Sequence, residues 1–96
     1  MYENTPFDLR GRAALITGGT RGLGKAMARI FAQAGAAVAI CGRNESQANS
    51  SAAEITSETG AHVEPIVADV GKRKETERLA REAVARLGKI DILVCN

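Results

Sequence analysis

Short apolar runs alternate with helix-like patterns along most of the chain. Four runs are wholly or largely apolar, which predicts strands buried on both faces at residues 13–17, 37–41, 62–68 and 90–95. Apolar residues spaced by three and four predict helices at 23–34 and 73–87, and a thinner pattern predicts another that Asn44 or Ser46 caps and Thr59 ends. Strands and helices in this alternation predict an α/β fold with a parallel sheet covered on both faces.

The same pattern predicts how these elements are placed. The first helix is expected to bury one apolar stripe, made of Leu23, Met27, Ile30, Phe31 and Ala34. Pro65 lacks the N–H that a central strand needs, so the strand at 62–68 belongs at a sheet edge. A doubly wound sheet with strand order 3-2-1-4 places it there. The apolar strand 90–95 then forms the other edge, so residues 1–96 are expected to be part of a larger fold, or to be covered by another chain.

A glycine cluster joins the first strand to the first helix. Thr17 precedes Gly18, Gly22 and Gly24, which gives the pattern T-G-x-x-x-G-x-G. Glycine lets the backbone approach a pyrophosphate closely, and the N-terminus of the following helix attracts the phosphate charge. The segment resembles the short-chain dehydrogenase/reductase family, whose members use it to hold NAD(H) or NADP(H) on a Rossmann-type sheet. The resemblance extends from about Phe7 to Asn96 and implies that 1–96 is the N-terminal part of a single dinucleotide-binding domain.

Two other interpretations of the glycine cluster stay open. Close packing alone can require a glycine-rich turn between a strand and a helix. The cluster also approaches the phosphate loop of nucleotide triphosphatases, because four residues separate Gly19 from Gly24 and Lys25 follows. Such a loop needs a hydroxyl at the next position to bind Mg²⁺, and this chain has Ala26 there. Asp69, at the end of an apolar strand, would be the metal-binding aspartate of that alternative.

The family resemblance implies a cofactor preference and a set of binding residues. NAD-preferring relatives usually carry an aspartate where this chain has Gly42, whereas Arg43 and Arg21 resemble the arrangement that binds NADP(H). Asp69 and Val70 resemble the positions that meet the adenine, although Asp69 has an alternative role as a helix cap. Asn96 resembles the second asparagine of the N-N-A-G motif, and Cys95 stands in place of the first. The expected cofactor-binding residues are Gly18, Thr20, Arg21, Gly22, Leu23, Gly24, Arg43, Asp69, Val70 and Asn96.

The residues that perform catalysis in this family are not expected within the chain. The family uses a serine and a Tyr-x-x-x-Lys pair, and the one tyrosine here, Tyr2, has no lysine four residues later. The resemblance implies a parent oxidoreductase that transfers a hydride between NADP(H) and a small carbonyl or alcohol substrate, and a homo-oligomer if full length. These 96 residues alone are expected to be inactive. A truncated dinucleotide-binding module without catalysis and a folding fragment without function are the alternatives, and the substrate is not predicted.

Composition excludes several other classes of protein. The chain is 45% apolar and its formal net charge is +2, with acids and bases interspersed, which favours no nucleic-acid partner. No apolar stretch approaches the roughly 20 residues that span a bilayer, and the N-terminus does not resemble a signal peptide, so a cytoplasmic location is expected. Cys41 and Cys95 fall on strands expected on opposite sides of the first strand. That separation is about 9.6 Å, too long for a disulfide, so both are expected to be free thiols.

Overall fold

A computed structural model describes residues 8–96 of the chain, and Tyr2 lies outside the described residues. Strands and helices alternate along these residues as the hydrophobic pattern predicts. The elements are β1 (Ala13–Thr17), α1 (Gly22–Gln33), β2 (Ala37–Gly42), α2 (Glu45–Thr59), β3 (Val63–Val67), α3 (Arg73–Leu87) and β4 (Ile92–Cys95). Each predicted element is therefore present, with ends that differ from the prediction by two residues at most.

The sheet has the predicted topology. Its four strands are parallel and lie in the order β3-β2-β1-β4, which makes it a Rossmann-type sheet. Pro65 lies on β3, which within residues 8–96 pairs only with β2, so its missing N–H removes no bond from a central ladder. Thr17 pairs with Cys41 on one side and with Cys95 on the other. Both cysteines are free thiols, as the strand positions predicted.

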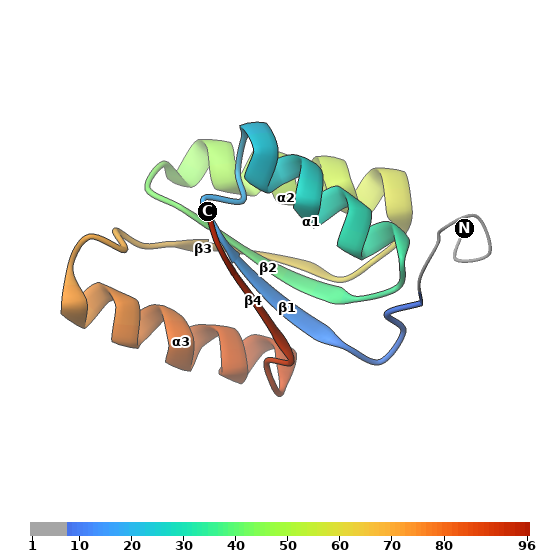
Figure 1. The fold of residues 1–96 in the computed structure, drawn as a ribbon. Helices are drawn as coiled ribbons and strands as arrows, with labels where there is room; N and C mark the ends of the chain where they lie inside the picture. The colour runs from blue at the N-terminus through green and yellow to red at the C-terminus, as the bar shows by residue number, and fades with distance from the viewer. Residues whose placement is uncertain (1–7) are drawn as a thin grey trace.

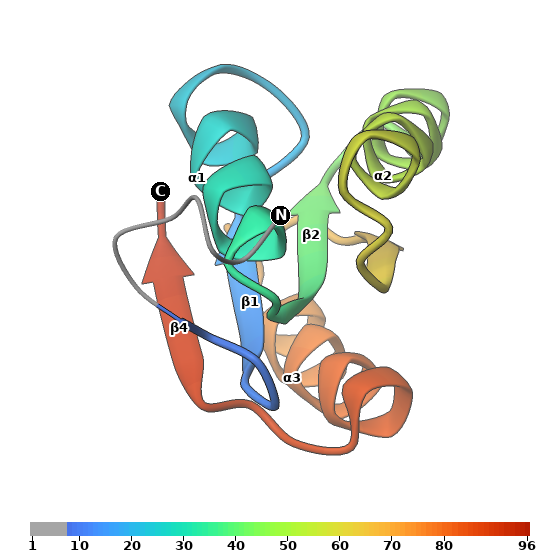
Figure 2. The same cartoon turned by 90° about the vertical axis from the view of Figure 1, so that its right-hand side faces the viewer.

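Helices cover both faces of the sheet. In Figure 1, α1 and α2 lie on one face and α3 lies on the other, and Figure 2 shows the same layers turned by 90°, with the strands running upward. One core cluster lies beneath α1 and α2 and includes Ile16, Ile40 and Ile55, while a second lies against α3 and includes Ile66 and Leu79. At about 25 cal/mol per Å² of apolar surface, burying each of these side chains contributes roughly 1.5–3 kcal/mol.

The predicted stripe of α1 was wrong in part. The residues of α1 that the fold buries are the small ones, Gly24, Ala28 and Ala32, whereas Leu23 and Ile30 remain 70% and 46% exposed. A Cβ built at Gly24 would overlap the carbonyl oxygen of Gly18, so the helix begins in direct contact with the turn before it. This close approach turns the small residues inward, and the larger Met27 and Phe31 are only partly buried against the core.

Asn44, not Ser46, caps α2. Its Oδ1 accepts a 2.8 Å hydrogen bond from the backbone N–H of Gln47. The apolar face of α2 is thin, as predicted, and Ile55 is its one large buried side chain. Charged contacts between helices supplement it, since Lys25 pairs with Glu54 and Arg29 donates to Glu58 at 2.6 Å.

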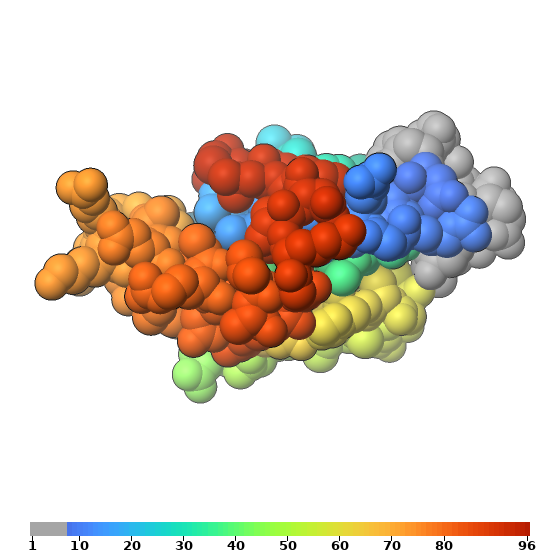
Figure 3. All heavy atoms as spheres, turned by 90° about the horizontal axis from the view of Figure 1, so that it is seen from below, coloured from blue at the N-terminus to red at the C-terminus, as the bar shows by residue number. Residues whose placement is uncertain are grey.

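β4 forms the edge of the sheet opposite β3. Asp91 joins it to β1, because Asp91 Oδ2 accepts from the N–H of Ala13 at 2.9 Å, and this bond lowers the pKa of the carboxyl. In Figure 3, which views the molecule from below, β4 and the segment that leads into it lie next to α3. Leu93 on β4 is 60% exposed, and among residues 8–96 no strand pairs with the outer edge of β4. No helix in that part of the chain is long and apolar enough to cross a membrane.

Candidate functional site

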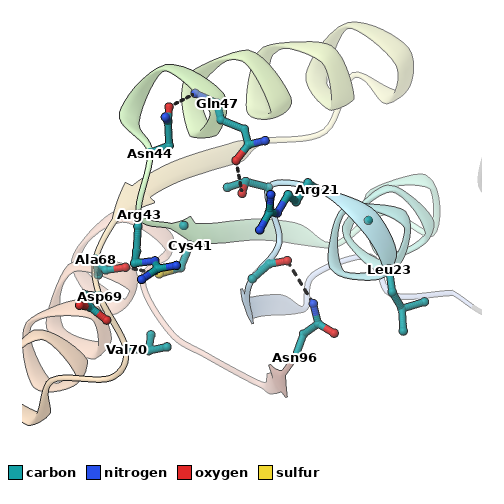
Figure 4. Close-up of a pocket in the computed structure, with 14 residues that line it drawn as sticks. Arg21, Leu23, Cys41, Arg43, Asn44, Gln47, Ala68, Asp69, Val70 and Asn96 are labelled. Carbon is teal, nitrogen blue, oxygen red and sulfur yellow. Dashed lines mark hydrogen bonds between the residues drawn. The ribbon is translucent and has the colours of Figure 1, made fainter.

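A cavity of about 930 Å³ lies where the parallel strands end. The turns after β1, β2 and β3 and the end of β4 all contribute to its lining (Figure 4). Its lining residues are Gly18, Thr20, Arg21, Gly22, Leu23, Cys41, Gly42, Arg43, Asn44, Gln47, Ala68, Asp69, Val70 and Asn96. In open parallel α/β sheets, ligands bind beyond the carboxyl ends of the strands, which makes this cavity the candidate site.

The turn between β1 and α1 combines left-handed backbone with open space. Gly18 and Gly22 have φ angles of 65° and 58°, which favour glycine, and nothing lies within 4 Å of a Cβ built at Gly22. Arg21 precedes α1 without a side-chain cap, and the first turn of α1 contains no acid. The positive end of the helix dipole therefore lies at the cavity without a neutralising side chain, which suits an anionic group such as a pyrophosphate.

Gly24 has a different role from the other expected binding residues. It does not line the cavity. A Cβ built there would overlap the carbonyl of Gly18 and lie 2.7 Å from Nδ2 of Asn96. Gly24 therefore lets α1 pack against the glycine turn. The other nine residues predicted from the sequence all lie in the cavity lining.

Arg21 and Arg43 bring two positive charges to the cavity from different elements. Arg21 precedes α1, and Arg43 follows β2. Within residues 8–96, neither guanidinium forms a hydrogen bond or ion pair with a protein group, whereas Arg29, Arg78 and Arg86 are all paired with acids. Figure 4 shows both side chains at the cavity. Unpaired arginines next to one cavity can bind phosphate through charge-assisted hydrogen bonds.

Asp69 holds the turn after β3 and does not cap α3. Its Oδ1 accepts from the N–H of Gly71 at 3.0 Å. The capping position of α3 is Lys72, which forms no side-chain cap. The alternative interpretation of Asp69 as a helix cap was therefore wrong. Asp69 and the half-exposed Val70 form the third side of the cavity.

The end of β4 steadies the glycine turn. Asn96 donates from Nδ2 to the carbonyl of Gly18 at 3.2 Å, and its backbone N–H donates to Thr17 Oγ1 at 3.1 Å. Thr17 donates in turn to the carbonyl of Val94 at 3.4 Å. Thr17 thus braces β1 against β4 and does not line the cavity. Cys95, in the usual place of an asparagine, is exposed on β4.

Several lining residues were missing from the sequence prediction: Cys41, Gly42, Asn44, Gln47 and Ala68. Three of them end strands or stand next to a strand end, so the register of the sheet could have indicated them. Cys41 is buried, which raises the pKa of its thiol, and it donates weakly to the carbonyl of Ala68 at 3.7 Å. Asn44 was predicted only as a cap. Nothing in the local pattern indicated Gln47, which enters the lining through its contact with Thr20.

The phosphate-loop interpretation finds no support in this geometry. Lys25, which such a loop would direct toward a nucleotide, instead forms an ion pair with Glu54 on α2. Neither Gly19 nor Lys25 lines the cavity.

The sheet and its cavity define a Rossmann-type nucleotide-binding fold, and comparison with known proteins identifies the family. The family model described as short chain dehydrogenase matches residues 12–96. An uncharacterized oxidoreductase of Mycobacterium tuberculosis is 43% identical over 90 residues, which cover 94% of this chain and 34% of that protein. The chain therefore belongs to the short-chain dehydrogenase family, and it spans about a third of the length of the curated relatives it matches.

Two similar solved structures contain a nicotinamide dinucleotide. The structure of Pseudomonas aeruginosa RhlG in a complex with NADP is 37% identical with a TM-score of 0.86, and the match covers 94% of this chain and 36% of that one. A 7α-hydroxysteroid dehydrogenase complexed with NADH and 7-oxo glycochenodeoxycholic acid is 38% identical with a TM-score of 0.85, and the match covers 90% and 33%. Relatives of this fold thus bind either cofactor.

Proposed function

We propose that this chain is the cofactor-binding part of an NADP(H)-dependent short-chain oxidoreductase that acts on a small carbonyl or alcohol substrate. The observation that carries the cofactor preference is the pair Arg21 and Arg43. Both line the cavity and have no partner among residues 8–96, and the residue before Arg43 is Gly42, the last of β2, which has no carboxylate. A 2′-phosphate would be attracted by the two guanidinium groups and would meet no opposing charge from position 42.

The lining residues divide among the parts of a dinucleotide. The turn from Gly18 to Leu23 and the N-terminus of α1 would bind the pyrophosphate through backbone N–H groups and the helix dipole. Arg21 and Arg43 would bind the adenosine 2′-phosphate, and Asp69 with Val70 would lie against the adenine. Asn96, which fixes the Gly18 carbonyl, would hold the turn where the dinucleotide passes β4. When bound, the nicotinamide supplies or accepts the hydride.

No residue of the chain is assigned to proton transfer. A serine with a Tyr-x-x-x-Lys pair performs this step in the family, and no such pair occurs in the 96 residues. We therefore propose that this chain is the N-terminal part of one dinucleotide-binding domain, that it binds NADP(H), and that it is inactive alone. The share of each relative that it spans, 34% in the M. tuberculosis oxidoreductase, supports this division.

The decisive experiment compares NADPH and NADH binding in the protein as its gene encodes it. We expect tighter binding of NADPH, and we expect Arg21→Ala and Arg43→Ala each to weaken NADPH binding by about tenfold or more, since a hydrogen bond to a charged group contributes roughly 1.5–3 kcal/mol. The same variants should change the affinity for NADH by less than about twofold, because NADH lacks the 2′-phosphate. Calorimetric titration measures both constants.

Arg81→Ala is the matched control, because Arg81 is exposed on α3 and lies outside the cavity lining. It should leave both constants unchanged. Equal losses of NADPH and NADH affinity in Arg21→Ala and Arg43→Ala would overturn the proposed preference. Binding of NADPH without reduction of any carbonyl by the encoded protein would favour a non-catalytic binding module instead.

A further inference from the structure

We infer that Thr20 is a specificity-determining residue, because it occupies the space that any side chain at position 42 would need. This inference deepens the proposed function and rests on its preference for NADP(H). Position 42 ends β2 and faces the cavity, where an acid would accept hydrogen bonds from the ribose hydroxyls and repel a 2′-phosphate. The side chain of Thr20 fills the space next to position 42, so position 42 can hold only glycine.

The steric conflict is between one turn and the neighbouring strand end. A Cβ built at Gly42 lies 2.7 Å from Oγ1, 2.7 Å from Cγ2 and 3.3 Å from Cβ of Thr20. Real Cβ atoms essentially never approach other heavy atoms to 2.7 Å. Gly42 is not among the glycines with positive φ, so its backbone conformation is open to any residue. The space taken by Thr20, rather than the backbone, therefore requires glycine at this position.

Rotation of Thr20 does not relieve the conflict. Both heavy branches of its β-carbon lie at the same distance from the built Cβ. A turn of χ1 to another staggered rotamer leaves at least one branch in one of these two places. Thr20 is also only 5% exposed, so most of its surface is packed against protein atoms.

Contacts on two sides prevent the turn itself from moving. Ser51 on α2 donates from Oγ to the carbonyl of Thr20 at 2.6 Å, and both residues are buried. Thr20 Oγ1 donates to Oε1 of Gln47 at 3.4 Å, also on α2. On the other side, the N–H of Gly19 donates to the carbonyl of Cys41 at 3.1 Å, which joins the turn to β2 immediately before Gly42.

The contact that excludes a carboxylate from position 42 also holds together the two segments that carry Arg21 and Arg43. Thr20 precedes Arg21, and Gly42 precedes Arg43, so the contact between Thr20 and Gly42 brings together the two segments that carry the charges. An acid placed at position 42 would have to displace Thr20 and the segment that presents Arg21. A change of cofactor preference from NADP(H) to NAD(H) therefore requires two substitutions, one at position 20 and one at position 42.

The test compares Gly42→Asp alone with the double variants Thr20→Ala/Gly42→Asp and Thr20→Val/Gly42→Asp in the protein as its gene encodes it. Titrations with NADH and NADPH give the binding constants. We expect Gly42→Asp alone to lose NADPH affinity without gaining NADH affinity. Thr20→Ala/Gly42→Asp should bind NADH about tenfold more tightly than Gly42→Asp, the effect of roughly one charge-assisted hydrogen bond. Thr20→Val keeps both branches and loses only the hydroxyl, so its double variant should show no such gain.

If Gly42→Asp alone binds NADH as tightly as Thr20→Ala/Gly42→Asp does, the inference is overturned. An equal gain in the valine double variant would overturn the steric argument. If the unaltered protein prefers NADH, the proposed function itself fails, and that result is read from the unaltered protein alone.

A second measurement needs no nucleotide and no charge at position 42. Gly42→Ala should lower the Tm by several degrees, because it adds only the Cβ that overlaps Thr20. Combined with Thr20→Ala, the decrease caused by Gly42→Ala should fall to less than half, since the remaining 3.3 Å contact asks for a shift of a few tenths of an ångström. Additive decreases in Tm would overturn the inference even if the aspartate variants do not fold.

Discussion

The two sides of the cavity are held in different ways. On the side built from β1, α1, β2 and α2, the contacts join elements far apart in the sequence: Ser51 donates to the carbonyl of Thr20, and Gly19 donates to the carbonyl of Cys41. On the side that follows β3, Ala68 still contacts β2, but the Asp69 side chain makes a local contact, since it accepts from Gly71 two residues later. Val70 on that side is 47% exposed. The first side is preorganised, and the second has room to adjust to a ligand.

On the preorganised side, adding a single methyl group should lower the free energy of unfolding the most. Gly24→Ala places a Cβ against the Gly18 carbonyl and against Asn96 Nδ2, and backbone cannot rotate away as a side chain does. We expect a loss of about 3 kcal/mol in the free energy of unfolding, at the upper end of the usual cost of overpacking. Urea denaturation followed by circular dichroism measures it.

Gly71→Ala is the matched substitution on the other side. Its built Cβ meets only Oδ1 of Asp69, at 3.1 Å, and Gly71 does not have a positive φ. A carboxylate can shift by a few tenths of an ångström, so the cost should stay below about 1 kcal/mol. Similar costs for the two substitutions would contradict the difference between the sides.

Removal of one hydrogen bond between elements should have the next largest effect. Ser51→Ala leaves the buried carbonyl of Thr20 without its 2.6 Å donor. We expect a loss of about 1–2 kcal/mol in the free energy of unfolding, since an unsatisfied buried acceptor keeps its desolvation penalty. NADPH affinity should decrease as well, because the turn that carries Arg21 loses a contact with α2.

Ser50→Ala tests whether this effect belongs to the hydrogen bond. Ser50 is the adjacent residue on the same helix, and it is exposed. Its substitution should change the free energy of unfolding by less than about 0.5 kcal/mol. If both alanine variants lose the same stability, the loss does not come from the contact with Thr20, since alanine favours a helix more than serine does.

Features that depend on local sequence patterns were predicted correctly, whereas features that depend on contacts between segments were not. The spacing of apolar residues was sufficient for the element order, and Pro65 was sufficient for the edge strand. The burial of α1 was mispredicted because it depends on how closely Gly24 approaches Gly18, a contact between backbone segments that hydrophobicity does not encode.

The cavity lining was predictable where a motif marks it. The glycine turn and Arg43 follow directly from the strand ends, and nine of the ten predicted residues line the cavity, with Gly24 as the exception. Gln47 was not predictable in this way, because its place in the lining comes from a contact with Thr20, 27 residues earlier. Contacts between elements that decide such placements need the three-dimensional packing.

The smallest change in stability is expected on the adjustable side. Asp69→Asn keeps an Oδ1 that can accept from the N–H of Gly71, so the free energy of unfolding should change by less than about 0.5 kcal/mol. NADPH affinity should nevertheless fall about threefold, because a neutral acceptor replaces a charged one at the position that we propose lies against the adenine. Asp69→Ala, which also removes the turn contact, serves as the comparison and should lose both. A large loss of stability in Asp69→Asn would mean that the charge itself holds this turn, and the two sides would then differ less than their contacts indicate.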